Sequence, residues 1–239
     1  MNQELREVLF LDIETVSYTD DFHSLDERLK TLWARKASHL RRDSELTDEQ
    51  LYLDRAAIFA EFGKVICICV GKFYEDENGV LTLKTKAYYS DDEKALLTEF
   101  KCMLDKLNAN TDKLCAHNGK EFDFPYLCRR MLVNGIALPA MLNIAGKKPW
   151  EVPHYDTMEL WKFGDYKHFT SLELLATIFN IPSSKSDIDG SKVNQVYHVE
   201  HDLARIKDYC LRDVEVLAQL FLKLRGIQLE QTLVVQSAS

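Results

Sequence analysis

The sequence has no long uncharged apolar run. No stretch of about 18 such residues occurs among its 239 positions, and no apolar segment follows a basic N-terminal stretch. These absences exclude a membrane-spanning helix and a signal peptide, so we expect a cytoplasmic protein without membrane contact. The six cysteines include no C-x-x-C pair, so a structural zinc site is not predicted and we expect buried, free thiols.

The sequence also lacks an excess of positive charge. Its net charge is −8, and its isoelectric point is near 5.4. This balance argues against a surface that grips duplex nucleic acid over many phosphates, so any contact with nucleic acid must be local. The densest basic patch is either a solvated face or a lid or guide for substrate, and it comprises Arg35, Lys36, Arg41 and Arg42.

A calcium-binding loop is absent as well. The segment 184–193 contains Asp187, Asp189 and Gly190, but the glycine is misplaced and His198 stands where the loop requires a glutamate. We therefore interpret the segment as an ordinary loop.

The sequence does contain enough apolar residues for one sizeable core, since 46% of them are hydrophobic and 10% are aromatic. We expect a single domain over 1–239, with a helical insertion at 17–62 and a tail at 226–239. Leucines at helical spacing predict two helices in the insertion, and Thr47 with Gln50 predicts a capping box for the second.

The periodicity along the rest of the chain predicts an α/β fold. Short apolar runs predict five strands, at 8–14, 63–74, 80–89, 113–116 and 154–157. Apolar residues at helical spacing predict helices at 91–107, 122–133, 158–163, 170–179 and 201–224, the fourth with a capping box of Thr170 and Glu173. Asn78-Gly79 predicts a hairpin. We therefore expect a mixed five-stranded sheet, three antiparallel strands and then parallel strands, flanked by helices and with the first strand central.

The first strand carries two acids. Asp12 and Glu14 lie two positions apart in the stretch Leu9–Thr15, the period at which a strand points side chains to the same face. Two carboxylates about 6.6 Å apart on a buried strand repel each other, and a divalent cation would relieve that repulsion. The alternative is that the strand simply ends here and its acids face water.

Two later stretches carry further polar residues. Asn118 breaks a strand, and Asp123 falls in the first turn of the helix that follows. In the helix 201–224, Tyr209 and Asp213 stand four apart on one face, beside the apolar stripe. Taken separately, these residues also fit a turn residue, an acid near a helix N-terminus, a boundary aromatic and a solvated acid.

Taken together, the three stretches resemble an enzyme family. D-x-E, N-x-x-x-F-D and Y-x-x-x-D, in this order, resemble the three motifs of the DEDD 3′–5′ exonucleases. The resemblance covers about 8–224 and is closest to the proofreading exonuclease domain of family-B DNA polymerases and its stand-alone bacterial relatives. Tyr209 marks the tyrosine subgroup, because Asp208 stands where the sister subgroup has histidine. The chain departs from a polymerase in having no room for palm, fingers and thumb, and in the insertion at 17–62, which leaves substrate choice open.

The resemblance implies a ribonuclease H-like fold and a site for two divalent ions. Mg²⁺ or Mn²⁺ ions ~3.5–4 Å apart would serve in-line attack on a phosphodiester, and hard oxygen ligands suit these ions and not zinc. Without cations, carboxylates ~4 Å apart would repel by about 4 kcal/mol per pair at an effective dielectric constant of about 20. By the resemblance, Asp12 would bridge both ions, Glu14 and Asp213 would complete the first, and Asp123 would hold the second, largely through water.

The resemblance also implies roles around these metal ligands. Tyr209 would orient the attacking water, and three residues would lie near the terminal nucleotide, namely Thr15, Asn118 and Phe122. We therefore expect a metal-dependent exonuclease that acts on 3′ ends of single-stranded nucleic acid, with DNA preferred and no other protein implied.

Two alternatives stay open. An RNA-trimming exonuclease of the same fold is compatible with the sequence, because no visible feature reads the 2′-hydroxyl. The other is a catalytically silent module that recruits a partner, although a binding role gives no reason to keep mutually repelling carboxylates. The group Lys147, Lys148 and Trp150 either clamps a phosphate and stacks a base or is an incidental surface group.

Overall fold

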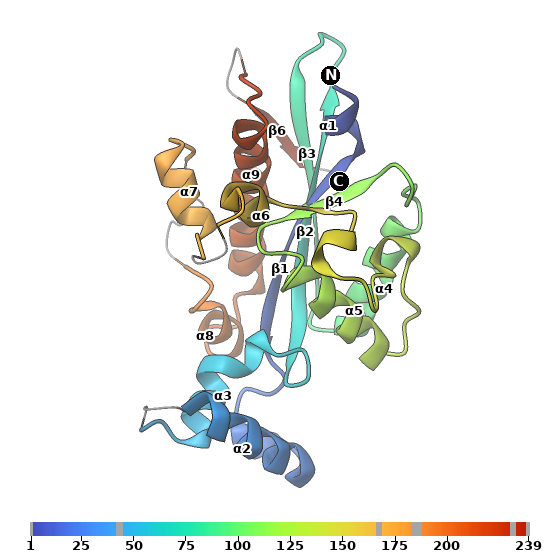
Figure 1. Cartoon of the computed structure of the whole chain (residues 1–239). Coiled ribbons are helices and arrows are strands. Elements are labelled where there is room, and N and C mark those ends of the chain that lie inside the picture. Colours follow the sequence, from blue (N-terminus) through green and yellow to red (C-terminus); the bar gives the residue numbers. More distant parts are fainter. Residues whose placement is uncertain (1, 42–44, 166–168, 183–187, 230–232, 238–239) are drawn as a thin grey trace.

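A six-stranded mixed sheet lies at the centre of the computed structural model, which describes residues 2–41, 45–165, 169–182, 188–229 and 233–237 (Figure 1). Within these residues the strand order is β5-β4-β1-β2-β3-β6. The bounds are β1 Val8–Ser17, β2 Gly63–Glu75, β3 Leu81–Tyr89, β4 Lys113–Ala116, β5 Tyr155–Asp156 and β6 Val234–Ser237. β1, β2 and β3 pair antiparallel, whereas β4, β5 and β6 join in parallel. The five predicted strands and the central place of β1 are confirmed.

The sixth strand differs from the prediction. β6 pairs with β3 at the edge of the sheet, in a segment that we predicted to be a tail. All four of its residues are exposed, so the segment has no alternation between buried apolar and exposed polar positions. Its backbone pairing with β3 and a hydrogen bond from the Tyr74 hydroxyl to the Gln236 side chain distinguish it from a tail.

β1 is buried on both faces. Val8 and Phe10 belong to the core on the side of α9 (Leu203–Leu224), whereas Leu9 and Leu11 belong to the core on the opposite side. The helices of that opposite side are α4 (Glu93–Leu104) and α5 (Asp123–Val133), as Figure 1 shows. Burial on both faces explains why this strand begins as a continuous apolar run.

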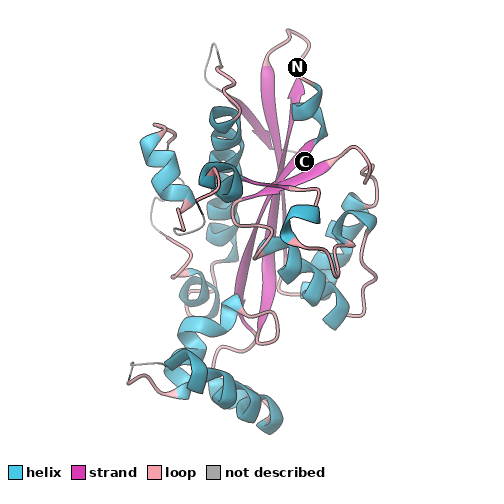
Figure 2. Cartoon of the chain, in the orientation of Figure 1, coloured by secondary structure: helices cyan, strands magenta, loops and turns pink. Residues whose placement is uncertain are grey.

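α9 joins the remaining helices to the sheet. Its predicted apolar stripe contacts β1, β2 and β3, and the Asp202 side chain caps its first turn by accepting from the Arg205 amide at 3.0 Å. Three short helices contact it, namely α6 (Thr157–Lys162), α7 (Leu172–Ile178) and α8 (Val193–His198). α1 (Gln3–Glu7) precedes β1. Figure 2 shows how helices cover both faces of the sheet.

The insertion after β1 folds around its own small core. Its helices are α2 (Glu27–Arg41) and α3 (Asp48–Arg55), followed by the single turn η2 (Ala56–Ile58). The Trp33 ring packs edge-on against Tyr52 and Phe62, with centroids 5.3 and 5.0 Å apart. Thr47 and Gln50 form the predicted capping box. The insertion therefore projects as a compact helical unit from one end of the sheet (Figure 1).

Several predictions about the periphery require correction. α7 begins at Leu172, so Ser171 caps it by accepting from the Leu174 amide at 3.2 Å, and the predicted box at Thr170 does not form. Cys102 is exposed and Cys128 is half-buried, whereas the other cysteines are buried free thiols.

In the basic patch, Arg41 pairs with Asp48, Lys36 lies over the Phe59 ring at 3.8 Å, and Arg42 is outside the described residues. Residues 184–187 of the predicted loop are also outside the described part of the chain. In the described ranges, no helix is both long and apolar enough to cross a membrane.

A buried ion pair joins α4, α5 and β2. Arg130 donates to both carboxylate oxygens of Glu93, at 2.8 and 2.6 Å, and to the Ala60 carbonyl at 2.9 Å. The same carboxylate accepts from the Val65 amide at 2.8 Å. The two charged side chains are only 5% and 8% exposed.

We predict that Arg130→Met lowers the free energy of unfolding by about 3–5 kcal/mol, because it leaves Glu93 buried without its partner. Urea unfolding followed by circular dichroism measures the loss. The matched control is Lys101→Ala, which removes the surface ion pair with Asp105 and should cost less than about 1 kcal/mol. Equal midpoints for the two variants would show that the buried pair does not carry this stability.

Candidate active site

The two acids of β1 point to the face that α9 covers. Asp12 lies opposite Cys69 of β2 and Glu14 lies opposite Cys67, and both cysteines belong to the core on the α9 side. The possible ligand atoms of Asp12, Glu14 and Cys210 lie within 4.8 Å of one another. The shared orientation expected from the two-residue period is therefore present, and the strand does not end in water.

α9 brings an acid and a phenol to this pair. Tyr209 is 7% exposed and Asp213 is 8% exposed, so neither is the solvated surface residue of the alternative interpretation. The Tyr209 hydroxyl donates a hydrogen bond to the Asp213 carboxylate. Burial, followed by the charges of Asp213 and Glu14, raises the pKa of Tyr209 above its usual range, so the phenol stays protonated.

Asp123 reaches the site from the opposite side of β1. The pairing of β1 with β4 includes Phe10 but not Ile13, which leaves the Ile13 amide available at this edge. That amide donates to the Asp123 carboxylate. Asp123 is 4% exposed, and burial raises its pKa to about 7. The first residue of α5 is thus held at the edge of β1 that β4 leaves unpaired.

The acids act on one another electrostatically. Burial and then the charges of Asp213 and Asp123 raise the pKa of Asp12 well above its usual range. Burial and then the charges of Asp12 and Asp213 do the same for Glu14. The buried thiol of Cys210 donates to Asp12 Oδ2 at 3.4 Å but carries no positive charge to offset this repulsion. A set of hard oxygen ligands under mutual repulsion fits divalent cations such as Mg²⁺ or Mn²⁺.

The turn before α5 is held in a strained conformation. Asn118 has φ 63°, in the left-handed region, and its amide donates to Asp156 Oδ1 at 2.9 Å. Lys120 donates from its amide to the other Asp156 oxygen at 3.1 Å. The Asn118 Oδ1 atom is buried without a hydrogen-bond partner. Backbone strain together with an unsatisfied buried acceptor is typical of a binding site.

The three residues expected near the terminal nucleotide do not share one location in the structure. Asn118 and Phe122 flank the turn that leads to Asp123, and the Phe122 ring packs against Tyr126 with centroids 5.3 Å apart. The Thr15 hydroxyl instead donates to the Ala57 carbonyl of the insertion at 2.9 Å. Thr15 therefore joins β1 to the insertion, although it lies next to Glu14.

Two residues of the site were missed by the sequence analysis. Asp156 caps α6 through the Met158 amide at 2.9 Å and also holds the Asn118 turn. An aspartate before a helical segment indicates a cap, but its second contact depends on the parallel pairing of β4 with β5. Cys210 follows Tyr209 on the apolar stripe, and no local pattern indicates that its thiol reaches Asp12.

The comparison with protein families assigns the chain. Residues 58–236 match the family described as a predicted 3′-5′ exonuclease related to the exonuclease domain of PolB. The chain belongs to this family. It is thus an exonuclease of the PolB-related type, and the predicted enzyme class is confirmed. PolB-like exonucleases use divalent metals, in agreement with the carboxylates assembled here. The matched range begins after β1, so only the structure brings Asp12 and Glu14 to the rest of the site.

A solved structure has a similar fold. The fold is similar to that of the family B DNA polymerase from the hyperthermophilic archaeon Pyrobaculum calidifontis, with a TM-score of 0.55 and 16% sequence identity. The similarity covers 91% of this chain and 24% of the polymerase, so the chain spans about a quarter of that protein. The predicted ribonuclease H-like fold is confirmed. None of the curated proteins matches the chain.

The raised pKa values predict how pH changes the stability of the metal-free protein. Asp12, Glu14 and Asp123 hold protons in the folded state that the unfolded chain releases above about pH 4. The folded state therefore binds more protons, and its stability falls as pH rises through the folded pKa values. We expect the melting temperature in chelator to decrease from about pH 5 to about pH 8.

Asp12→Asn should raise the melting temperature of the metal-free protein and make this pH dependence shallower, because one of the repelling charges is removed. Added Mn²⁺ should stabilise the wild type by mass action and the variant much less. The control is Asp208→Asn, an exposed acid of α9, which should behave as wild type. A variant that gains the wild-type increment from Mn²⁺ would show that Asp12 is not a metal ligand.

Proposed function

We propose that the chain removes nucleotides from the 3′ end of single-stranded nucleic acid, with DNA preferred, by hydrolysing phosphodiester bonds with two divalent ions. The observation that carries this proposal is the convergence of Asp12 and Glu14 from β1, Asp123 from α5 and Asp213 from α9 in one buried site. In this proposal residues 1–239 act as one exonuclease domain, with 17–62 as its insertion and β6 as an edge strand of its sheet.

The four acids would hold Mg²⁺ or Mn²⁺. The charges of Asp213 and Asp123 act on both Asp12 and Glu14, so the four carboxylates form one electrostatic group. Divalent ions bound there would lower the pKa of an attacking water and neutralise the charge that builds on the phosphate. The Ile13 amide and the Cys210 thiol donate hydrogen bonds that orient the carboxylates. Both donors are neutral, so they leave the negative charge of the carboxylates uncompensated.

Tyr209 would position the attacking water. A phenol with a raised pKa remains protonated at neutral pH and is a poor general base. Its hydroxyl is held by the Asp213 carboxylate, so it stays beside the acids and can share a hydrogen bond with a water molecule. The contribution of Tyr209 is therefore orientation and not proton removal.

Three residues would receive the terminal nucleotide. The unpartnered Oδ1 of Asn118 offers an acceptor to a sugar hydroxyl or a base amine, and Asp156 keeps this side chain in place by fixing the turn. The half-buried Phe122 ring offers an apolar surface to the sugar or base. Thr15 would act more indirectly, through the backbone beside Glu14.

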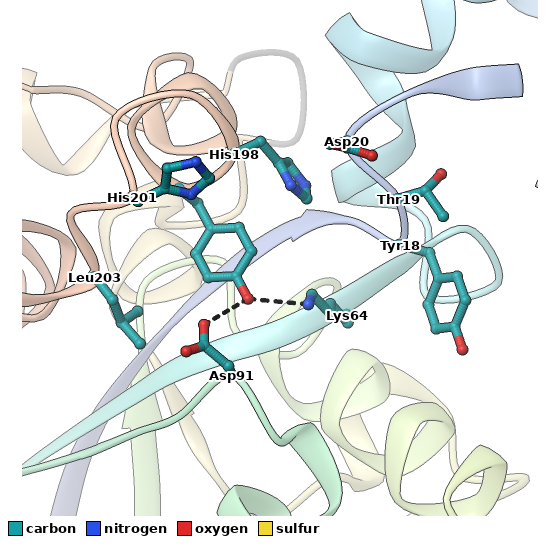
Figure 3. A pocket seen from close by; sticks show the side chains of 9 residues that line it. Tyr18, Thr19, Asp20, Lys64, Asp91, His198, His201 and Leu203 are labelled. Atoms are coloured by element: carbon teal, nitrogen blue, oxygen red, sulfur yellow. Dashed lines mark hydrogen bonds between the residues drawn. The ribbon is translucent and has the colours of Figure 1, made fainter. Parts of the chain in front are cut away.

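A pocket of about 550 Å³ supports a guide role for the insertion. It lies beyond the end of β1, between the first residues of the insertion and α8. Figure 3 shows Tyr18, Thr19 and Asp20 on one side of it and His198 and His201 on the other. The Tyr197 hydroxyl accepts from Lys64 at 3.0 Å and donates to Asp91 at 2.8 Å. A hollow of this size lies in the range of pockets that bind a small ligand such as a single nucleotide.

The polarity of cleavage tests the proposal. With Mg²⁺ or Mn²⁺ present, a single strand labelled at its 5′ end should give progressively shorter labelled fragments, and a 3′ label should appear at once as mononucleotide. DNA should be degraded faster than RNA of the same sequence, and chelator should abolish both reactions. Cleavage of a circular single strand, or unchanged rates in chelator, would contradict the proposal, whereas faster RNA degradation would identify the exoribonuclease alternative.

Variants of α9 separate water positioning from metal binding. We expect Tyr209→Phe to retain the Mn²⁺-induced rise in melting temperature and to lose about 10- to 10³-fold in turnover, because one positioning hydrogen bond is removed. Asp213→Asn should lose more turnover and also bind Mn²⁺ more weakly, since a ligand charge is gone. Asp208→Asn serves as the exposed control on the same helix. Full activity of Tyr209→Phe would show that the Tyr209 hydroxyl is not needed for catalysis and that the ring only packs.

A further inference from the structure

Three thiols meet between β2 and α9. Cys67 and Cys69 are two residues apart on β2 and face α9, from which Cys210 faces back. Their Sγ atoms lie within 4.8 Å of one another, and those of Cys67 and Cys69 are 3.7 Å apart. All three side chains are fully buried. No step proposed above uses Cys67 or Cys69.

The spacing of the sulfur atoms fits a shared ion better than a disulfide. Zn–S bonds of about 2.3 Å place neighbouring sulfur ligands of a tetrahedral ion about 3.8 Å apart. A disulfide requires about 2.05 Å between its sulfur atoms. We propose that Cys67, Cys69 and Cys210 form a binding site for a thiophilic divalent ion of the zinc class, and that this ion inhibits the exonuclease.

The chemistry of the ligands distinguishes this site from the hydrolytic one. Thiolates select soft or borderline ions, whereas Mg²⁺ and Mn²⁺ prefer the oxygen ligands of the acids. Each thiol releases its proton to solvent when it binds, so one divalent ion and three thiols give three protons and a group with one net negative charge. The spacing of Cys67 and Cys69 in the sequence does not match a zinc motif, because the third ligand, Cys210, comes from a helix distant in sequence.

Cys210 connects the two sites. Its Sγ donates to Asp12 Oδ2 at 3.4 Å, and the same sulfur atom also forms a group within 4.8 Å with Asp12 and Glu14. The Asp12 carboxylate is half-buried, so an ion from solvent can reach it first and pass from it to the buried thiols. When the three thiolates bind an ion, Cys210 loses the proton that it donates to Asp12. The fourth coordination position of the ion then attracts the Asp12 carboxylate. Inhibition follows because Asp12 is withdrawn from the hydrolytic site; this part of the inference rests on the proposed function.

The binding part is tested on the reduced, metal-free full chain with Cd²⁺ as the probe. Thiolate-to-cadmium absorption in the ultraviolet should saturate at one ion per chain and persist in excess Mg²⁺. Cys67→Ala and Cys69→Ala should each weaken binding by more than about 100-fold, because a direct ligand is lost where loss of a supporting contact already costs about 10- to 100-fold. Cys102→Ala, at an exposed cysteine of α4, should bind as wild type.

Absence of this absorption, or wild-type affinity in both folded variants of β2, would overturn the site. Circular dichroism establishes folding, and the second variant keeps the test decisive if the first does not fold. These measurements require no nuclease activity, so they remain valid if the proposed function fails.

The inhibition part uses Mg²⁺-supported cleavage of single-stranded DNA. One equivalent of Zn²⁺ should abolish the activity of wild type and of Cys102→Ala, and a thiol-competitive chelator should restore it. Cys67→Ala should keep its basal activity and tolerate the same Zn²⁺ concentration. Equal inhibition of Cys67→Ala and wild type would refute inhibition through the thiol site and would assign the effect to zinc on the carboxylates.

Discussion

Mutual repulsion among buried carboxylates is the constraint on which the rest of the structure depends. Asp12 lies on a strand that is buried on both faces, and charges from α5 and α9 act on it. Donors that reach the acids include the Ile13 and Asp123 amides, the Cys210 thiol and the Tyr209 hydroxyl, and these four are neutral. They orient the oxygen atoms and leave the negative charge for cations. The contrast with Arg130 and Glu93, where opposite charges compensate each other, shows that the fold can neutralise a buried acid elsewhere.

The central strand brings its acids together because its neighbours end at different positions. β2 pairs with β1 from Leu9 to Ser17, whereas the pairing of β1 with β4 stops at Phe10. The edge exposed beyond that point receives Asp123, and the face beneath α9 receives Asp213 and Tyr209. A sheet that was fully paired on both sides would have no backbone amide to offer Asp123, so the short β4 is part of the site.

The first five strands and the candidate acids were predictable because they depend on local patterns. The apolar runs of β1 and β2, the period of Asp12 and Glu14, and the four-residue spacing of Tyr209 and Asp213 are all visible within single elements. Features that depend on pairing between distant segments were not. β6 has no hydrophobic alternation, and the second role of Asp156 requires β4 and β5 to be neighbours. The contact of Cys210 with Asp12 likewise requires α9 to be docked on the sheet.

The Ala57 carbonyl links the insertion to β1 and to α5. It accepts hydrogen bonds from Thr15 at 2.9 Å and from Tyr126 at 2.8 Å, so one backbone oxygen ties the insertion to both β1 and α5. At about 1 kcal/mol each, these two bonds alone would hold a displaced insertion to about 3% of molecules. Because Thr15 adjoins Glu14 and Tyr126 lies one turn from Asp123, such a displacement would also release the backbone that aims two of the acids. A substrate bulky enough to displace the insertion would therefore disturb the carboxylate site that is proposed to cleave it.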